Sequence, residues 1–220
     1  MSVKVSGDPL DSTGASKEAE SAHDQAESAS ALGQRIRDLR KESGMTLEQA
    51  SAATGLSRAA LSKIERGEMS PTYDSLCKLA EGFRIDLAAL ISGRPQDFSG
   101  FAVTRAKEGA VQETERFVHH LLAPDFGGRA LYVFETQVLA TKFEEYDQWD
   151  QHDSEDLLYV LEGAVVVRMK GHAPVELGVG DSLQMDGRIP HEMIAVETED
   201  PPASGKVSAR LLWISVPARR

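Results

Sequence analysis

The chain has 220 residues, enough for one large domain or two small ones with proper cores. Its formal net charge of −11 repels nucleic acid overall, but the charge is uneven: residues 1–31 sum to −4, residues 32–92 to +1 and residues 93–220 to −8. A single cysteine, Cys77, excludes an intramolecular disulfide framework, and no apolar run reaches the roughly 20 residues of a membrane helix.

Residues 1–31 are rich in Ser, Ala, Gly, Asp and Glu and have almost no large apolar side chains. Such a segment buries too little surface to offset its ordering entropy, which predicts a disordered acidic tail. The segment also lacks the charged start and apolar centre of a signal peptide. Together with the lone cysteine, this favours a cytoplasmic protein.

Residues 32–92 predict a bundle of five short helices. Apolar residues repeat at helical spacing from Leu32, and this first helix breaks at the sequence ESG. Each later helix follows a residue that caps helix N-termini. The expected capping residues are Thr46, Ser57 and Asp86, and Pro71 and Thr72 open the fourth helix.

The second and third helices meet across the sequence TGLS, a tight turn in which Gly55 supplies the left-handed residue. Apolar positions pin the third helix to the bundle and leave a basic face outward. Arg and Lys can bind guanine edges in the major groove, and a helix N-terminus can hold a phosphate. The alternative is that these charges only solvate a helix face. The predicted DNA-binding residues are Thr46, Ser57, Arg58, Ala59, Ser62, Lys63 and Arg66.

The stretch LGQRIRDLRKESGMTLEQASAATGLSRAALSKIERGEMSPTYDSLCKLAEGF closely resembles the phage-repressor (Xre-type) helix-turn-helix family over about a quarter of the chain. The resemblance implies that Arg58, Ala59 and Lys63 face bases, with Ser57 and Arg66 near the DNA backbone. One departure is Ala50-Ser51, where the family usually has Leu-Ala, which implies looser packing of the second helix.

Residues 93–100 read as a linker, and beyond them the apolar pattern changes to that of short strands separated by Gly and Pro clusters. This favours an antiparallel sandwich or barrel. The expected strands are FAVTRA, RFVHHLL, ALYVFETQVL, DLLYVLEGAVVVRM, PVELGVGDSLQM, HEMIAVETE and ARLLWISV.

Two stretches, HDSEDLLYVLEGAVVVRM and ELGVGDSLQMDGRIPHEM, resemble the signature motifs of the cupin superfamily. The resemblance implies a small antiparallel barrel with a pocket over residues 101–220, and so an α+β multidomain chain. In metal-binding cupins a His-x-His pair, a Glu and a later His converge. Those positions read Asp150, His152, Asp156 and His191 here, so two of the four differ in type.

Three interpretations of this cluster remain open. His152, Asp156 and His191 could hold a divalent metal such as Mn, Fe, Ni or Zn. The four residues could instead bind an organic effector directly, with the imidazoles as hydrogen-bonding groups, or the acids could form a solvated loop. His119 and His120 are neighbours on a strand, so at most one points inward.

The sequence therefore favours a transcriptional regulator, not an enzyme, whose DNA reader is fused to a cupin-like effector sensor. Its expected partners are double-stranded operator DNA, a small-molecule effector and a second copy of the chain, with no membrane partner. A homodimer is expected because one helix-turn-helix unit reads too few base pairs for specificity. The alternatives are a metal-dependent cupin enzyme (an oxygenase or isomerase) that carries a DNA-binding domain, and a ligand-free DNA-binding antitoxin or scaffold.

Overall fold

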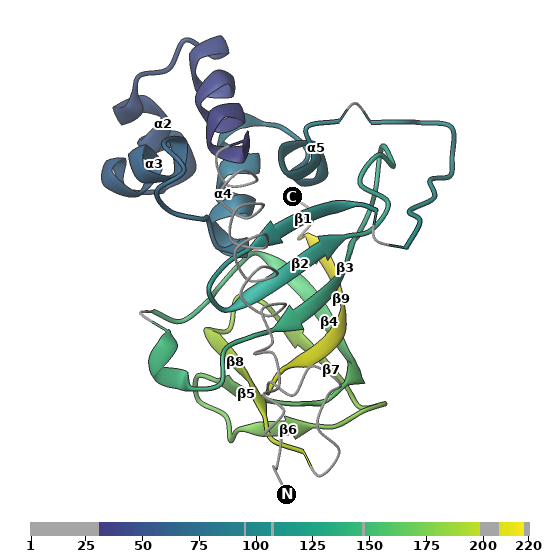
Figure 1. Cartoon of the computed structure of the whole chain (residues 1–220). Helices are drawn as coiled ribbons and strands as arrows, with labels where there is room; N and C mark the ends of the chain where they lie inside the picture. The colour runs from purple at the N-terminus through teal and green to yellow at the C-terminus, as the bar shows by residue number, and fades with distance from the viewer. Residues whose placement is uncertain (1–30, 95, 107, 147, 199–206, 218–220) are drawn as a thin grey trace, which may run out of the picture.

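A computed structural model describes the chain over residues 31–94, 96–106, 108–146, 148–198 and 207–217. It has a helical half and a strand-rich half, and Figure 1 shows the helices packed against one end of the strands. The helices α4 and α5 lie nearest to the sheets. The predicted disordered tail falls outside the described residues, apart from Ala31.

The helical half confirms the predicted five helices. The first covers residues 31–42, and the others are α2 (Leu47–Thr54), α3 (Arg58–Glu65), α4 (Tyr73–Phe83) and α5 (Leu87–Ser92). Each predicted capping side chain accepts a hydrogen bond from a backbone N–H in the first turn of its helix. Gly55 ends α2 with φ 72°, the left-handed conformation that the tight turn before α3 requires.

Leucine and isoleucine side chains from the first helix, α3 and α4 form the core of this half. A Cβ at Gly82 would lie 2.6 Å from the side chain of Thr54, so only glycine allows α4 to approach α2 this closely. The helix α4 therefore supports the unit formed by α2, the turn and α3. The most deeply buried side chains of the helical half include Ile36, Leu61, Ile64, Leu76 and Leu79.

The strand-rich half confirms the expected antiparallel organisation. Its hydrogen bonds form a six-stranded sheet in the order β1-β2-β3-β9-β4-β7 and a three-stranded sheet in the order β6-β5-β8. Over the described residues the strands thus form two sheets, without a closed ring of hydrogen-bonded neighbours. The strands are β1 (Ala110–Glu113), β2 (Phe117–Leu121), β3 (Tyr132–Val138), β4 (Ser154–Glu162), β5 (Ala164–Met169), β6 (Val175–Leu177), β7 (Ser182–Asp186), β8 (His191–Val196) and β9 (Ala209–Pro217).

Alternation along the strands decides which side chains reach the interior. In β4, Ser154, Asp156 and Leu158 are buried, while Glu155 and Tyr159 on the opposite face are exposed. In β9, the buried series is Ala209, Leu211, Trp213 and Ser215. β9 pairs with β3 on one side and β4 on the other, so it lies in the middle of the six-stranded sheet.

One local expectation was wrong. The segment FAVTRA forms no strand, and Phe101 and Val103 are 71% and 62% exposed. An alternating pattern does not make a strand where no neighbouring strand accepts its hydrogen bonds. The first strand is instead β1, whose sequence AVQE is too short and too polar to stand out. Within the predicted linker, Asp97 forms an isolated bridge with Phe126.

Candidate functional site

The outer face of α3 carries the predicted DNA-binding residues. Arg58, Ala59, Lys63 and Arg66 are exposed, and Ser62 is half-buried. Thr46 and Ser57 are exposed at the N-termini of α2 and α3, where each caps its own helix. On α3 the exposed residues Arg58, Ala59 and Lys63 lie away from the buried Leu61 and Ile64, while Thr46 lies at the start of α2.

The basic side chains of this face are paired with nearby polar groups. Arg66 donates to Glu68 through Nε at 2.6 Å and also contacts Ser62, and Arg58 lies 3.8 Å from Glu48. All the charged members of these pairs are largely exposed, so the pairs contribute little to stability. The guanidinium groups of Arg58 and Arg66 therefore remain accessible to solvent.

A buried ion pair behind α3 was missed by the sequence analysis. Arg40 on the first helix makes two hydrogen bonds to Glu65 on α3, Nε to Oε1 at 2.6 Å and an Nη to Oε2 at 2.7 Å. Arg40 also donates to the carbonyl of Met45 at 3.1 Å. Both side chains are nearly inaccessible to solvent. The pair fixes the orientation of α3, and 25 residues of separation hide it from local patterns.

In the strand-rich half, the structure gathers three of the four predicted pocket residues. His152 precedes β4, Asp156 lies within it and His191 begins β8, and all three are buried. The imidazole centroids of His152 and His191 are 5.0 Å apart, and His152 Nε2 lies 3.4 Å from Asp156 Oδ2. Glu155, the adjacent acid, points to the opposite face, where Gln184 donates to it.

Hydrogen bonds fix which ring nitrogen of each histidine faces the pocket. Ser154 Oγ donates to Asp156 Oδ1 at 2.9 Å, so its oxygen must accept from His152 Nδ1, 2.7 Å away. His191 Nδ1 donates to the carbonyl of Ile189 at 2.8 Å. Nε2 of each neutral ring is therefore left with a free lone pair.

Three buried atoms of this cluster make no hydrogen bond with any residue that the structure describes: Nε2 of His152 and Oδ2 of Asp156, which face each other at 3.4 Å, and Nε2 of His191. Buried polar atoms almost always have a hydrogen-bond partner. A cation, or a ligand that carries a hydrogen-bond donor, would therefore be stabilised beside these three atoms. Burial lowers the pKa of His152 to about 3, with His191 nearby adding to the effect. Burial also raises the pKa of Asp156, whereas hydrogen bonds from Ser215 and Ser154 lower it.

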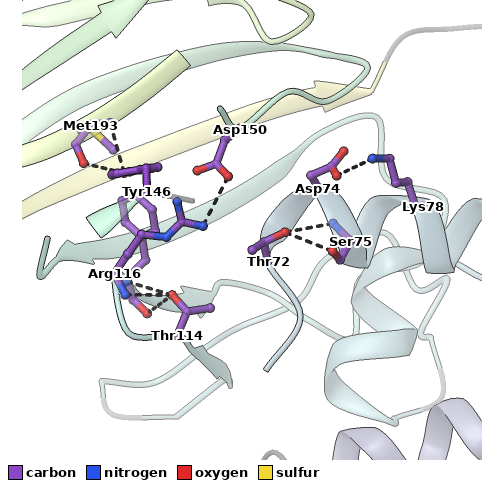
Figure 2. A network of polar contacts seen from close by, with 10 residues as sticks. Thr72, Asp74, Ser75, Lys78, Thr114, Arg116, Tyr146, Asp150 and Met193 are labelled. Carbon is purple, nitrogen blue, oxygen red and sulfur yellow. Dashed lines mark hydrogen bonds and ion pairs between the residues drawn. The ribbon is translucent and has the colours of Figure 1, made fainter. Parts of the chain in front are cut away.

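The fourth residue, Asp150, lies at the edge of the pocket. Its backbone forms an isolated bridge with His191, while its carboxylate turns to Arg116 at 3.4 Å. Figure 2 shows this pair beside Tyr146, whose ring lies 4.1 Å beneath the Arg116 guanidinium. Burial raises the pKa of Asp150, and Arg116 acts in the opposite direction. The Asp150 carboxylate thus forms an ion pair with Arg116 and does not lie with the side chains of His152, Asp156 and His191.

The donor set only partly fits a divalent metal. Two imidazole nitrogens and a carboxylate are a common ligand set, and each Nδ1–H is held by an acceptor as metal-binding histidines require. Yet among the residues that the structure describes, no three His, Cys, Asp or Glu side chains converge in a ligating arrangement. The chemistry of the predicted trio His152, Asp156 and His191 suits a metal, but its placement here does not.

Close packing explains the position of His152. A Cβ at Gly187 would lie 2.4 Å from the ring of His152, and Gly187 accepts the backbone N–H of His152 at 3.0 Å. Gly187 in the sequence MDGRIPH therefore leaves the space into which the imidazole fits. Any larger residue at this position would push the ring out of the pocket.

Residues outside the predicted set complete the pocket. His119 on β2, Phe134 on β3 and Trp213 on β9 are buried and face inward, and Tyr73 reaches in from α4. Strand alternation within RFVHHLL and ARLLWISV places His119 and Trp213 on the inner face, so that signal was present in the sequence. Nothing in the sequence indicates that Tyr73, in the helical half, meets these rings.

A cleft of about 1030 Å³ opens between α4 and the strand-rich half, next to the pocket. This is about as large as small-molecule sites become. On one side it is lined by Asp74, Cys77 and Lys78 of α4, and on the other by the segment from Gln148 to Ser154. His152 and Tyr73 line both this cleft and a smaller cavity of about 20 Å³ beside Asp150.

Comparison with known proteins matches each half separately. The helix-turn-helix family model matches residues 36–90, and the cupin domain model matches residues 142–214. An uncharacterized HTH-type transcriptional regulator of Sinorhizobium fredii, y4dJ, is 34% identical over 70 residues, which cover 32% of this chain and 88% of that protein. The chain belongs to the HTH-type transcriptional regulators.

Other regulators resemble the whole arrangement. The HTH-type transcriptional regulator PuuR of Escherichia coli is 27% identical over 163 residues, which cover 73% of this chain and 85% of that regulator. The crystal structure of an HTH_3 family transcriptional regulator from Vibrio cholerae superposes with a TM-score of 0.60 at 26% identity, covering 89% of this chain and 99% of that one. The match to SutR of E. coli, 40% identical over 57 residues, spans only 32% of that regulator.

This HTH-type regulator therefore joins a helix-turn-helix DNA-binding domain to a C-terminal cupin domain, as the sequence predicts. Across the described residues, none of its helices has the length and apolar character that crossing a bilayer requires.

Proposed function

We propose that the regulator senses a small-molecule effector in its cupin domain and that effector binding changes its affinity for operator DNA. The observation that carries this proposal is the cluster of three buried, unpartnered polar atoms on His152, Asp156 and His191, next to a large cleft. The cleft is walled on one side by α4, the helix on which the helix-turn-helix unit rests. We infer that the two sheets are the halves of a cupin barrel around this pocket and that the DNA-binding role implies a cytoplasmic location.

We expect α3 to lie in the major groove, with Arg58 as a base-reading residue. Arg58→Ala should weaken binding to operator DNA by about 1–3 kcal/mol and relax sequence preference at one position. Arg66→Ala should weaken all sequences alike and flatten the salt dependence, because a phosphate contact carries no sequence information. Fluorescence anisotropy with specific and scrambled duplexes at two salt concentrations measures both effects. If both variants bind like the parent protein, α3 is not the reading helix.

We expect His191→Ala to uncouple the effector from DNA. Effector and operator should each change the other's affinity by the same factor, a coupling of about 1–3 kcal/mol. His191→Ala should remove this coupling while the unliganded protein keeps its DNA affinity. Glu155→Ala, on the opposite face of β4, is the matched control and should leave the coupling intact. The effector itself is to be identified by native mass spectrometry of the purified protein. Coupling that persists in His191→Ala would remove the pocket from the mechanism.

We infer that the regulator acts without catalysis, because the relatives are regulators and two of the four family ligand positions have changed. The second candidate is a metal-dependent cupin enzyme such as an oxygenase or isomerase, which the donor atoms of His152, Asp156 and His191 suit in type but not in placement. Metal analysis of the protein before and after chelation, and with Asp156→Asn, separates the two. A stoichiometric metal that Asp156→Asn loses, with turnover that His191→Ala abolishes and DNA binding indifferent to ligands, would support the enzyme.

We also infer a homodimer, because two helix-turn-helix units are needed to read a palindromic operator. Several apolar side chains on the strand-rich half are exposed, among them Tyr159, Leu161 and Val216. Light scattering at micromolar concentration, with and without operator DNA, tests this inference. A monomer mass under both conditions would contradict it.

A further inference from the structure

Tyr73 is the first residue of α4, and its side chain projects from the helical half into the cupin domain. Its ring is surrounded by four others, with centroids at 5.0 Å for His152, 5.6 Å for Phe134, 5.7 Å for Trp213 and 6.3 Å for His119. These four rings come from β2, β3, β9 and the segment before β4. We call them the ring cage.

The hydroxyl of Tyr73 finds a partner at the inner end of the cage. It donates to Oγ of Ser215 at 2.9 Å, and Ser215 is completely buried on β9. Burial raises the pKa of Tyr73 well above its usual value, so the phenol is held uncharged. A flat apolar body with one polar end in a matching pocket is how small-molecule sites hold their ligands.

Tyr73 also separates two spaces. It lines the interdomain cleft of about 1030 Å³ on one side and the cavity of about 20 Å³ beside Asp150 on the other. The small cavity has room for about one water molecule. A molecule entering from the cleft therefore meets the Tyr73 ring before it can reach Trp213 or His119.

We propose that Tyr73 occupies the position of the effector, and that an uncharged aromatic ligand with one hydrogen-bonding group competes with it for the ring cage. The proposal rests on the proposed function of the cupin pocket and deepens it. The cage offers a ligand four rings and one hydroxyl. Arg116, which lines the adjoining small cavity, already faces Asp150, and Lys78, which lines the cleft, is paired with Asp74 at 2.6 Å. These surroundings favour an uncharged aromatic ring over a charged group.

Displacement of Tyr73 would be transmitted directly to the DNA reader. Tyr73 begins α4, and α4 packs against α2 so closely that Gly82 is required at the contact. If the Tyr73 ring leaves the cage, α4 loses its ring contacts with β2, β3, β9 and the segment before β4, and its packing against the cupin domain is weakened. Other contacts across this boundary include Tyr132 to Asp86 at 2.9 Å, Gln112 to the carbonyl of Pro71 at 3.4 Å and the packing of α5 on β1.

The chain carries its own reporter of this movement. Cys77 is the only cysteine in the sequence, lies one turn beyond Tyr73 on α4 and lines the cleft. Burial raises the pKa of its thiol to about 12, while a hydrogen bond with Tyr73 acts in the opposite direction, so thiol reagents should react slowly while α4 is docked. Because Tyr73 contacts the thiol directly, labelling is interpreted together with the radius of gyration. Separation of α4 from the cupin domain should expose the thiol.

The test compares Tyr73→Ala with Tyr159→Ala, an exposed tyrosine on the outer face of β4. Cys77 should react with a disulfide reagent about tenfold faster or more in Tyr73→Ala, and the radius of gyration from small-angle scattering should increase. Tyr159→Ala should match the wild type in both. p-Cresol, which has the shape of the missing side chain, should bind Tyr73→Ala about tenfold tighter than the wild type, because nothing competes for the cage. It should also restore slow labelling and the compact dimensions.

Two more conservative substitutions provide the test if Tyr73→Ala does not fold. Tyr73→Phe and Ser215→Ala each remove the same hydrogen bond, so each should accelerate Cys77 labelling and the double variant should add nothing further. Wild-type labelling and dimensions in all Tyr73 variants, or p-cresol without effect on Tyr73→Ala, would overturn the proposal. None of these measurements uses DNA or the natural effector, so their failure is distinct from a failure of the proposed function.

Discussion

Glu65→Gln should lower the free energy of unfolding by about 3–5 kcal/mol, because it leaves the Arg40 guanidinium buried without its counter-charge. Both side chains of this pair are largely inaccessible, and two hydrogen bonds join them. Chemical denaturation followed by circular dichroism measures the loss from the helices. Fluorescence reports separately on the strand-rich half, because both tryptophans, Trp149 and Trp213, lie outside the helices. The helical transition should therefore move to lower denaturant.

The matched control is Glu135→Gln, which breaks an ion pair of similar length on the surface. Glu135 lies 3.0 Å from Arg210, and both side chains are more than two-fifths exposed. Exposed pairs contribute less than about 1 kcal/mol, so this variant should unfold almost like the wild type. Equal losses in both variants would mean that burial of the Arg40–Glu65 pair does not determine its contribution. Operator affinity should fall with Glu65→Gln, since the pair orients α3.

Acidification should destabilise the regulator through His119. Its ring is buried, and its Nδ1 lies 2.9 Å from Thr136 Oγ1. Burial lowers its pKa in the folded protein to about 4, from an ordinary value of 6.5. The unfolded chain therefore takes up a proton below pH 6.5 that the folded protein refuses until about pH 4. Linkage gives a loss of about 2 kcal/mol at pH 5 relative to pH 7.5 from this residue alone.

The difference between variants isolates this contribution, because Asp150 and Asp156 act in the opposite direction. Their pKa values are raised by burial, so their contribution to stability increases as the pH falls. The glutamine side chain in His119→Gln cannot take up a proton, and it places an amide beside Thr136. Between pH 7.5 and pH 5 the free energy of unfolding of this variant should therefore fall by about 2 kcal/mol less than that of the wild type. His120→Gln changes the neighbouring residue on the opposite face of β2. Because His120 adds only the smaller part of the lowering of the His119 pKa, this variant should retain most of the wild-type slope. The prediction fails if the two variants show the same pH dependence.

Features that depend on neighbouring residues could be predicted from the sequence. The N-caps at Thr46, Ser57, Thr72 and Asp86 are local hydrogen bonds, and they set the starts of four helices correctly. Alternation around Asp156 likewise separated its buried carboxylate from the exposed Glu155. These signals required only the period of a helix or strand.

Features that join distant parts of the chain could not be predicted in this way. The Arg40–Glu65 pair spans 25 residues and the Tyr73–Ser215 hydrogen bond spans 142. Asp150 was expected near the rim of the pocket, but the sequence did not indicate that its carboxylate pairs with Arg116, on the segment before β2. Tertiary packing decides each of these contacts, and no local period encodes it.

The central place of β9 in the six-stranded sheet has a consequence for the order of folding. Both of its neighbours, β3 and β4, precede it by many residues, and each must wait for β9 to satisfy one row of its backbone hydrogen bonds. During synthesis from the N-terminus, the helix-turn-helix half is complete while the strands still present two unpaired edges, which are templates for aggregation. Pairing over this sequence distance is slow. The nascent cupin domain is therefore the part of this regulator most in need of a chaperone, and it becomes able to enclose a ligand only when Trp213 and Ser215 arrive with the last strand.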